Sequence, residues 1–274
     1  ILNVTPDSFS DGGSYKDDIE LAAQTALQLE RDGAAIIDVG GESTRPGAKE
    51  VAVEEELRRT IPVIRRIREL SEIPISIDTR HADVAKAAVE AGADIVNDIS
   101  GGQFDENMLA TVAELGVPVI LMHMRGTPEN MLSMTDYDDV VEDVCEALLE
   151  RSQAAEAAGI PRWRQVMDPG IGFAKDLRGN LLLLKNLRYL QSKLGDFPIL
   201  LGTSRKGFIG KITGEPIAAE RDWGTVASCV AALCLGDSSP GCHILRVHNV
   251  KGTKQATMTM DAIVRAENDQ KDQA

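Results

Sequence analysis

The feature that most constrains the fold is a unit that recurs along the whole chain: a short apolar run, a polar loop and an amphipathic stretch of helical length. Short apolar runs rich in β-branched residues are typical of strands that are buried on both faces of a parallel sheet. Strands are predicted at residues 1–4, 36–39, 75–77, 94–97, 117–122, 165–167, 199–202 and 244–247. Helices are predicted at about residues 18–32, 51–70, 81–91, 105–115, 138–158, 178–194, 218–235 and 252–268.

The regular alternation of strands and helices predicts an α/β protein that is a single (β/α)8 TIM barrel over residues 1–274. A doubly wound open sheet is the alternative architecture. We expect residues upstream of Ile1 to have been lost, because the chain starts within a strand, and residues 267–274 to form a frayed tail. Pro62 falls inside the predicted helix 51–70, where it is expected to cause a kink or to mark a later helix start.

Acidic residues outnumber basic ones: 43 Asp and Glu against 29 Lys and Arg give a formal net charge of −14. Such a surface disfavours binding to nucleic acids or to anionic membranes, so an anionic ligand needs a local basic site. No apolar run is long enough to span a membrane. The four cysteines form no CxxC pair, which favours reduced thiols and a cytoplasmic location, or an organellar matrix if an upstream transit segment was removed.

The loop after the second predicted strand carries the densest group of polar side chains. Its sequence is GGESTRPG, residues 40–47. The two glycines allow the main chain to approach a ligand closely, and Glu42, Ser43, Thr44 and Arg45 follow them. Loops at the carboxyl ends of barrel strands carry the functional groups of TIM-barrel enzymes. This loop is therefore predicted to be functional, against the alternative of a plain surface connection.

Polar side chains also follow the other predicted strands, and a barrel brings all of them to one face. They are Asn3, Asp78, Asn97, His123, Asp168, Lys206, Arg246 and His248, with Met122 at the end of the fifth strand. Carboxylates such as Asp78 and Asp168 accept hydrogen bonds from adjacent amino and ring N–H groups, and Asn97 can donate as well as accept. This donor and acceptor pattern predicts a site for a flat, nitrogen-rich heterocycle.

A second group of residues supplies positive charge for an anion. Arg246 and His248 at the last strand can hold phosphate oxygens, and Arg45 can join them from its loop. The segment SRKG, residues 204–207, ends a strand and begins a helix, so that its backbone N–H groups favour an anion. We therefore expect carboxylates and amides near the centre of the site and cations at one side.

Each of these residues also has a purely structural explanation. Asp78 and Asp168 are of a type that caps helices, His123 could be a buried histidine with satisfied hydrogen bonds, and Lys206 could be a solvated charge. Asp38, inside the second predicted strand, fits a structural role in the barrel as well as a catalytic one. Polar residues at the same end of so many strands are hard to explain by chance, which favours a functional site.

Several common motifs are absent. The chain has no GxGxxG after its first strand and no GxxxxGK[ST] phosphate loop. It has no GxSxG nucleophile turn and no HExxH zinc motif. These absences argue against a Rossmann dehydrogenase, a P-loop NTPase, an α/β-hydrolase and a zinc protease of that type.

Two long motifs and six short ones carry a resemblance to a known family. The long motifs are ILNVTPDSFSDGG at residues 1–13 and GGESTRPG at residues 40–47. The short ones are SIDT (76–79), NDISGG (97–102), LMHM (121–124), DPGIGF (168–173), SRK (204–206) and RVH (246–248). In these motifs, which follow one another over nearly the whole chain, the sequence resembles the dihydropteroate synthases, which are pterin-binding TIM barrels.

The resemblance implies the condensation of 7,8-dihydropterin-6-ylmethyl pyrophosphate with 4-aminobenzoate, which gives 7,8-dihydropteroate and pyrophosphate in folate biosynthesis. It implies an SN1-like reaction in which pyrophosphate leaves first, with Mg²⁺ as cofactor and fixed carboxylates that stabilise the pterin cation. It also implies a homodimer formed through the late helices, and an enzyme that is a sulfonamide target.

The site residues that the resemblance implies fall into three groups. For the pterin they are Asp78, Asn97, Met122, Asp168, Lys206 and Arg246. For the pyrophosphate they are Asn3, Arg45, Arg246 and His248, with Asn3 also a ligand of Mg²⁺. For 4-aminobenzoate they are Ser43, Thr44, Pro46 and Phe173, and the carboxylate of this substrate is expected at the helix start after Lys206. The residues assigned to catalysis are Asp78, Lys206 and Arg246.

One departure and two other functions stay open. Many relatives have a serine after the Arg–Lys pair where this chain has Gly207, so that a hydroxyl near the aminobenzoate carboxylate is missing. A methyltetrahydrofolate methyltransferase would share the pterin barrel but needs no pyrophosphate ligands, and an inactive pterin-binding scaffold would need no intact loops. Arg45, Arg246 and His248 favour the synthase.

Overall fold

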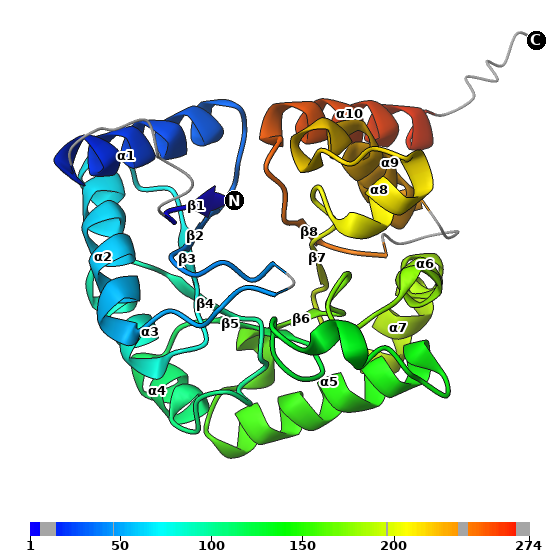
Figure 1. Ribbon diagram of the computed structural model, residues 1–274, viewed down its shortest axis with the longest axis horizontal. Coiled ribbons are helices and arrows are strands. Elements are labelled where there is room, and N and C mark those ends of the chain that lie inside the picture. Colours follow the sequence, from blue (N-terminus) through cyan, green and yellow to red (C-terminus); the bar gives the residue numbers. More distant parts are fainter. Residues whose placement is uncertain (6–14, 46, 196, 235–240, 267–274) are drawn as a thin grey trace, which may run out of the picture.

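The structure is a computed structural model that describes residues 1–5, 15–45, 47–195, 197–234 and 241–266. The strands lie together in the interior, and the helices form a ring around them (Figure 1). This is the arrangement of a TIM barrel, so the predicted fold is confirmed. The predicted tail at residues 267–274 lies outside the described residues.

All strand pairings are parallel, in the order of the chain. The first six strands form one sheet and the last two pair with each other. The strands are β1 (Leu2–Asn3), β2 (Ile37–Gly40), β3 (Ile75–Asp78), β4 (Ile95–Asp98), β5 (Val119–Met122), β6 (Gln165–Asp168), β7 (Leu200–Leu201) and β8 (Ile244–Leu245).

Two contacts join these sheets into a ring. Met167 of β6 pairs in parallel with Ile199, which immediately precedes β7. The nitrogen of Ile1 donates a hydrogen bond to the carbonyl of Val247 at 2.9 Å, so the chain just past β8 meets the start of β1. The barrel is therefore closed at both edges of the large sheet.

The strand register places the polar residues of the strand ends side by side. Across the first four strands the aligned residues are Asn3, Gly40, Asp78 and Asn97. Met122 of β5 is aligned in the same way with Asp168 of β6. Neighbouring apolar residues such as Ile77 and Val96 are fully buried. Because side chains alternate along a strand, apolar packing on the outer face leaves the polar residues to converge inside the barrel.

The helices cover the outside of the barrel, and most lie between consecutive strands. They are α1 (Tyr15–Arg31), α2 (Val53–Leu70), α3 (Ala82–Glu90), α4 (Met108–Leu115), α5 (Val140–Ala157), α6 (Leu177–Lys185), α7 (Leu187–Leu194), α8 (Gly207–Thr213), α9 (Asp222–Cys234) and α10 (Val250–Val264). Short 3-10 turns occupy Met131–Ser133, Arg162–Arg164 and Ala218–Arg221. Within the described ranges, no helix combines the length and the apolar character that crossing a membrane requires.

The structure corrects the helix prediction in three places. The predicted helix 178–194 is two helices, α6 and α7, separated at Asn186, whose side-chain nitrogen donates to the Leu182 carbonyl at 2.8 Å. The helix α8, which follows β7, is absent from the eight predicted ranges, although the predicted helix start at residues 204–207 is confirmed. A later helix start at Pro62 is wrong, because α2 runs from Val53 through Pro62. Burial of the apolar face of α2, with Ile64 and Ile67 fully enclosed, offsets the hydrogen bond that proline cannot make.

Candidate active site

A buried guanidinium lies at the centre of the barrel. Arg246 follows β8, and its Nη2 donates to Oδ2 of Asp78 at 2.5 Å while its Nε donates to Oδ2 of Asp38 at 2.6 Å. Asp38 Oδ1 also accepts from Ser76 Oγ at 2.6 Å and from Asn97 Nδ2 at 3.3 Å. One hydrogen-bonded group therefore joins β2, β3, β4 and the end of β8, and Asp38 holds two predicted site residues in place.

The two carboxyl groups share one cation and differ in pKa. Burial raises the pKa of Asp78 above its usual range, and the charge of Asp38 raises it further against the attraction of Arg246. Burial also disfavours the charged form of Asp38, but Arg246 and the Ser76 hydroxyl bring the pKa of Asp38 below its usual value. Asp38 is therefore the firm ionic partner of Arg246, and the charge of Asp78 responds to whatever else occupies the site.

The end of β1 meets the segment after β8. Asn3 Nδ2 lies 3.4 Å from His248 Nε2, and Ser204 Oγ lies 2.8 Å from His248 Nδ1. Burial lowers the pKa of His248 to about 3, so its imidazole is neutral near pH 7. His248 can therefore meet an anion as a neutral hydrogen-bond donor, and Ser204 is the residue that orients it.

Asp168 and Lys206 approach the centre from β6 and from the loop after β7. Asp168 is buried, and burial raises its pKa while Lys206 opposes the rise. Lys206 Nζ donates to the Ile171 carbonyl and lies 4.6 Å from the centre of the Phe173 ring. Burial lowers the pKa of Lys206 to about 8, with Asp168 opposing the shift and Arg246 adding to it. The position of the Lys206 ammonium is thus fixed by these contacts, and the alternative explanation of Lys206 as a solvated surface charge is wrong.

An apolar cluster lies beside the charged centre and apart from the main core. It contains Ile99, Met122, Met124, Met131, Phe173 and Ala174. Met122 and Phe173, both predicted site residues, are therefore packed in one apolar group. An apolar wall next to convergent carboxylates and amides suits a flat ring with polar edges.

The loop between β2 and α2 carries the remaining predicted residues. Ser43 and Thr44 are half-buried and Arg45 is exposed. The nearby Gly47 N–H donates to the Pro128 carbonyl at 2.9 Å, so this loop touches the loop after β5. Pro46, which was predicted to contact 4-aminobenzoate, lies outside the described residues.

The sequence analysis missed a buried lysine that ties two loops of the site together. Lys175 Nζ contacts His123 Nδ1 at 2.9 Å and donates to the carbonyls of Phe173 at 2.9 Å and Gly170 at 3.0 Å. Burial lowers the pKa of both Lys175 and His123. His123 is thus a buried histidine with a hydrogen-bond partner, which agrees with the structural explanation given for it above. Nothing in the local sequence separates Lys175 from a surface lysine.

The comparisons with known proteins agree with this geometry. The family of pterin-binding enzymes matches residues 1–248. The dihydropteroate synthase of a Synechocystis species is 46% identical over 265 residues, which cover 97% of this chain and 89% of that protein. This chain belongs to the dihydropteroate synthase family.

Other relatives include longer proteins and proteins whose structures have been solved. The Pneumocystis carinii folic acid synthesis protein fol1 is 46% identical over 268 residues, which cover 96% of this chain but 35% of that protein. A structure of Xanthomonas albilineans dihydropteroate synthase with 4-aminobenzoic acid has 44% sequence identity and a TM-score of 0.89. It covers 97% of this chain and 92% of that one. The family that the motifs indicated is therefore confirmed, and the roles of single residues in the dihydropteroate synthase site stay predictions.

Proposed function

We propose that this protein condenses 7,8-dihydropterin-6-ylmethyl pyrophosphate with 4-aminobenzoate to give 7,8-dihydropteroate and pyrophosphate in folate biosynthesis. The observation that carries the proposal is the group of Asp38, Asp78, Asn97 and Arg246, joined across four strands at the face where TIM barrels hold their active sites. Membership of the dihydropteroate synthase family supports the same reaction.

The pterin ring is proposed to bind between the polar centre and the apolar cluster. Asp78 and Asp168 offer carboxyl oxygens to ring and amino N–H groups, and Asn97 offers both a donor and an acceptor. Met122 packs against the ring on the apolar side, while Arg246 is the cation beneath it. A bound pterin would compete with Arg246 for Asp78, whose raised pKa makes it the weaker of the two carboxylate partners.

The pyrophosphate is proposed to lie toward β1 and β8, where Asn3, His248 and Arg246 converge and Arg45 can approach from its loop. The residues fit Mg²⁺ in one respect: the Asn3 amide nitrogen faces His248, which leaves its oxygen, a ligand type that Mg²⁺ prefers. Mg²⁺ retains waters and binds substrate phosphates, so a single protein oxygen is sufficient. Bound there, it would offset negative charge on pyrophosphate.

The proposed chemistry begins with cleavage of the bond between the pterin methylene carbon and the pyrophosphate oxygen. The fixed carboxylates of Asp78 and Asp168 would stabilise the positive charge that then develops on the pterin. The amine of 4-aminobenzoate then forms the new C–N bond and loses a proton to the released pyrophosphate or to water. This substrate is held near Ser43, Thr44 and Phe173, with its carboxylate toward Lys206. Each protein group acts through its fixed charge, so no residue needs to form a covalent intermediate.

A direct test mixes the purified protein with both substrates and Mg²⁺ and measures pyrophosphate and dihydropteroate. We expect equal amounts of the two products, and no condensation product when 4-aminobenzoate is replaced by benzoate, which lacks the attacking amine. Methyl transfer from methyltetrahydrofolate without pyrophosphate release would instead support a methyltransferase. Binding of the pterin without either reaction would support a scaffold protein.

We also propose that the protein is a homodimer and acts in the cytoplasm. The late helices expose large apolar side chains, among them Trp223 of α9 and Met258 and Ile263 of α10. A shared face would remove these side chains from water. Light scattering coupled to size-exclusion chromatography gives the mass in solution, and a monomer at micromolar concentration would contradict the dimer.

A further inference from the structure

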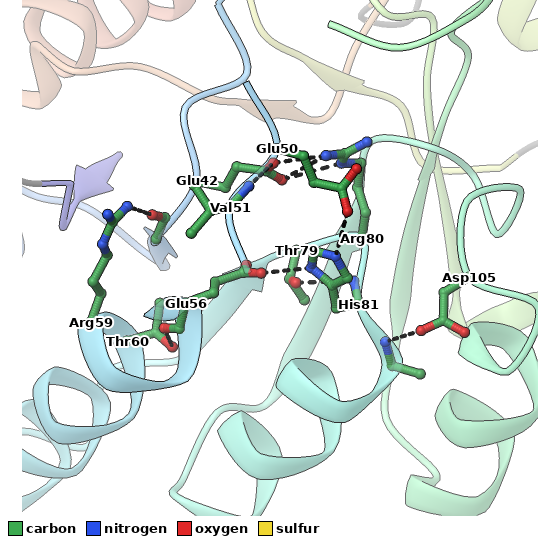
Figure 2. A network of polar contacts seen from close by, with 12 residues as sticks. Glu42, Glu50, Val51, Glu56, Arg59, Thr60, Thr79, Arg80, His81 and Asp105 are labelled. Carbon is green, nitrogen blue, oxygen red and sulfur yellow. Dashed lines mark hydrogen bonds and ion pairs between the residues drawn. The ribbon is translucent and has the colours of Figure 1, made fainter. Parts of the chain in front are cut away.

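The loop that carries Ser43, Thr44 and Arg45 is closed at its base by one carboxylate. Glu42 stands at the beginning of this loop, and its Oε1 accepts a hydrogen bond from the backbone N–H of Val51 at 3.2 Å. A single side chain thus joins the two ends of a segment that spans nine positions. Figure 2 shows Glu42 and Val51 together, with Arg80 facing the same carboxylate.

The partner of Glu42 is an arginine in the loop that follows the neighbouring strand, β3. Arg80 Nη2 lies 2.8 Å from Oε1 and 2.9 Å from Oε2 of Glu42, and its Nε donates to Oε2 at 3.2 Å. Both side chains are buried, with 3% of Arg80 and 5% of Glu42 exposed. The guanidinium also lies over the Phe104 ring, 4.1 Å from its centre. Since Arg80 follows Asp78 by two residues, the pair ties the loop to the strand that carries a central carboxylate.

The helix after the loop is fixed to the same base. Arg59 Nη1 of α2 donates to the Gly41 carbonyl at 2.8 Å, and Glu56 Oε2 lies 2.8 Å from His81 Nδ1 (Figure 2). Gly41 is packed so closely that a Cβ there would lie 2.7 Å from Thr60 Cγ2. The base of the loop is therefore a dense, bonded structure, whereas Arg45 further along is exposed.

The energetics of the buried Glu42–Arg80 pair favour a role in positioning the loop over a role in stabilising the fold. Two charges that leave water lose hydration, and their mutual attraction often only balances that loss, so a buried pair is a poor source of stability. The arginine fork does, however, fix a carboxylate in direction as well as distance. A loop that is held in its competent conformation binds its ligand more tightly by the factor by which that conformation is enriched.

We propose that Glu42 and Arg80 form a positioning pair that presets the loop carrying Ser43, Thr44 and Arg45 for the second substrate, 4-aminobenzoate. The inference rests on the proposed function, in which this loop shapes the 4-aminobenzoate pocket. The pterin is held by side chains of β3, β4 and β6, which keep their places without the loop. Loss of the pair therefore weakens 4-aminobenzoate binding and leaves binding of the bare pterin nearly unchanged.

The test compares Glu42→Gln, Arg80→Gln and Arg80→Lys with the wild type. Calorimetric titration with 6-hydroxymethyl-7,8-dihydropterin gives the pterin affinity, and steady-state kinetics with Mg²⁺ gives kcat and the Michaelis constant for the aminobenzoate substrate. We expect this KM to rise about tenfold or more, which corresponds to a competent loop population of about one tenth. The pterin affinity should stay within about twofold, because sites without shared partners vary independently.

Arg66→Gln is the matched control. Arg66 lies on the same helix, α2, and pairs with Glu20 of α1 in an ion pair that is partly exposed. Its loss removes an arginine from α2 without touching the loop base, so both constants should match those of the wild type. A KM rise in this control equal to that in Arg80→Gln would overturn the proposal, since the loss of an arginine away from the loop base would then suffice.

The remaining outcomes are also decisive. Equal weakening of pterin and 4-aminobenzoate binding would show that the pair has a general structural role. An unchanged KM in the Gln variants would show that the loop does not need the Glu42–Arg80 pair. If the Gln variants do not fold, Arg80→Lys decides alone: it keeps the charge but loses the fork, and a wild-type KM would refute the proposal. A wild type that releases no pyrophosphate would instead refute the proposed function.

Discussion

Arg246 lies between two carboxylates of unequal basicity, and this inequality separates their roles. Asp38 is bonded to Arg246, Ser76 and Asn97, so it is committed to holding the centre together. Asp78 has Arg246 as its ionic partner and a raised pKa, so its charge is the one available to a ligand. These hydrogen bonds favour the structural alternative for Asp38, in which it positions Arg246 and Asn97.

Asp78→Asn removes the charge and keeps the size of the side chain. We expect kcat to fall by about 10²–10³, because one preorganised electrostatic contact to a developing cation is lost. The Kd of the pterin pyrophosphate should change less, since Asn97, Asp168 and the pyrophosphate contacts remain. The measurement is kcat beside the equilibrium Kd of the same variant. An unchanged kcat with a raised Kd would show that Asp78 only anchors the pterin.

The lowered pKa of Lys206 predicts a pH dependence of 4-aminobenzoate binding. Its pKa is lowered to about 8, so the ammonium is present at pH 7 and is largely lost at pH 9. We expect the affinity for 4-aminobenzoate, which stays anionic over this range, to fall about tenfold between pH 7 and pH 9 as the protonated fraction falls. Calorimetry at both pH values, with pterin and pyrophosphate present, tests this. The Lys206→Arg side chain stays charged over this range, so this variant should show no pH dependence. An equal fall in affinity in that variant would show that another group causes the pH dependence.

At the scale of elements, charged residues that bridge two loops were hardest to foresee from the sequence. Polar residues at strand ends could be predicted, because a short apolar run marks where each strand stops. Lys175 and Arg80 could not, since their burial depends on carbonyl groups and a carboxylate that only the folded chain brings near. The break at Asn186 was hidden for a similar reason: apolar residues at helical spacing continue on both sides of it.

Replacing Lys175 tests the tie between the loops after β5 and β6. Lys175→Met keeps the length of the side chain but leaves the Gly170 and Phe173 carbonyls without their donor. We expect the free energy of unfolding to fall by about 1–3 kcal/mol, the usual cost of unsatisfied buried groups. Urea unfolding measures it, with the exposed Lys185→Met as control. A more stable Lys175→Met protein would show that burying the ammonium costs more than its hydrogen bonds return.

Pro62 offers a test of α2, the helix that follows the loop carrying Ser43, Thr44 and Arg45. In Pro62→Ala, α2 gains an N–H that can bond to the Arg58 carbonyl in the preceding turn. We expect a gain of about 2 kcal/mol in the free energy of unfolding, since proline in a helix interior costs about 3 kcal/mol and its restriction of the unfolded chain returns part of this. Thermal and urea unfolding give the change. A loss of stability would mean that packing of the half-buried ring outweighs the new bond.

For the whole molecule, the fold could be predicted in outline and its closure could not. The alternation of apolar runs and helical stretches indicated eight strands and a barrel, and β2 to β6 lie within a few residues of their predicted bounds. The runs at 199–202 and 244–247 are reduced to two-residue strands, β7 and β8. These two strands pair with each other over two residues, and the ion pairs of Arg246 add links from the end of β8 to β2 and β3.

The central arginine also couples activity to completion of the chain. Its two ion pairs connect positions 208 and 168 residues apart, so they are among the last contacts that a growing polypeptide can make. Until β8 is in place, Asp38 and Asp78 face the barrel interior without their counter-ion, an arrangement that penalises a barrel closed too early. We therefore expect a chain that ends before Arg246 to leave Asp38 and Asp78 without this counter-ion and to form a less stable barrel.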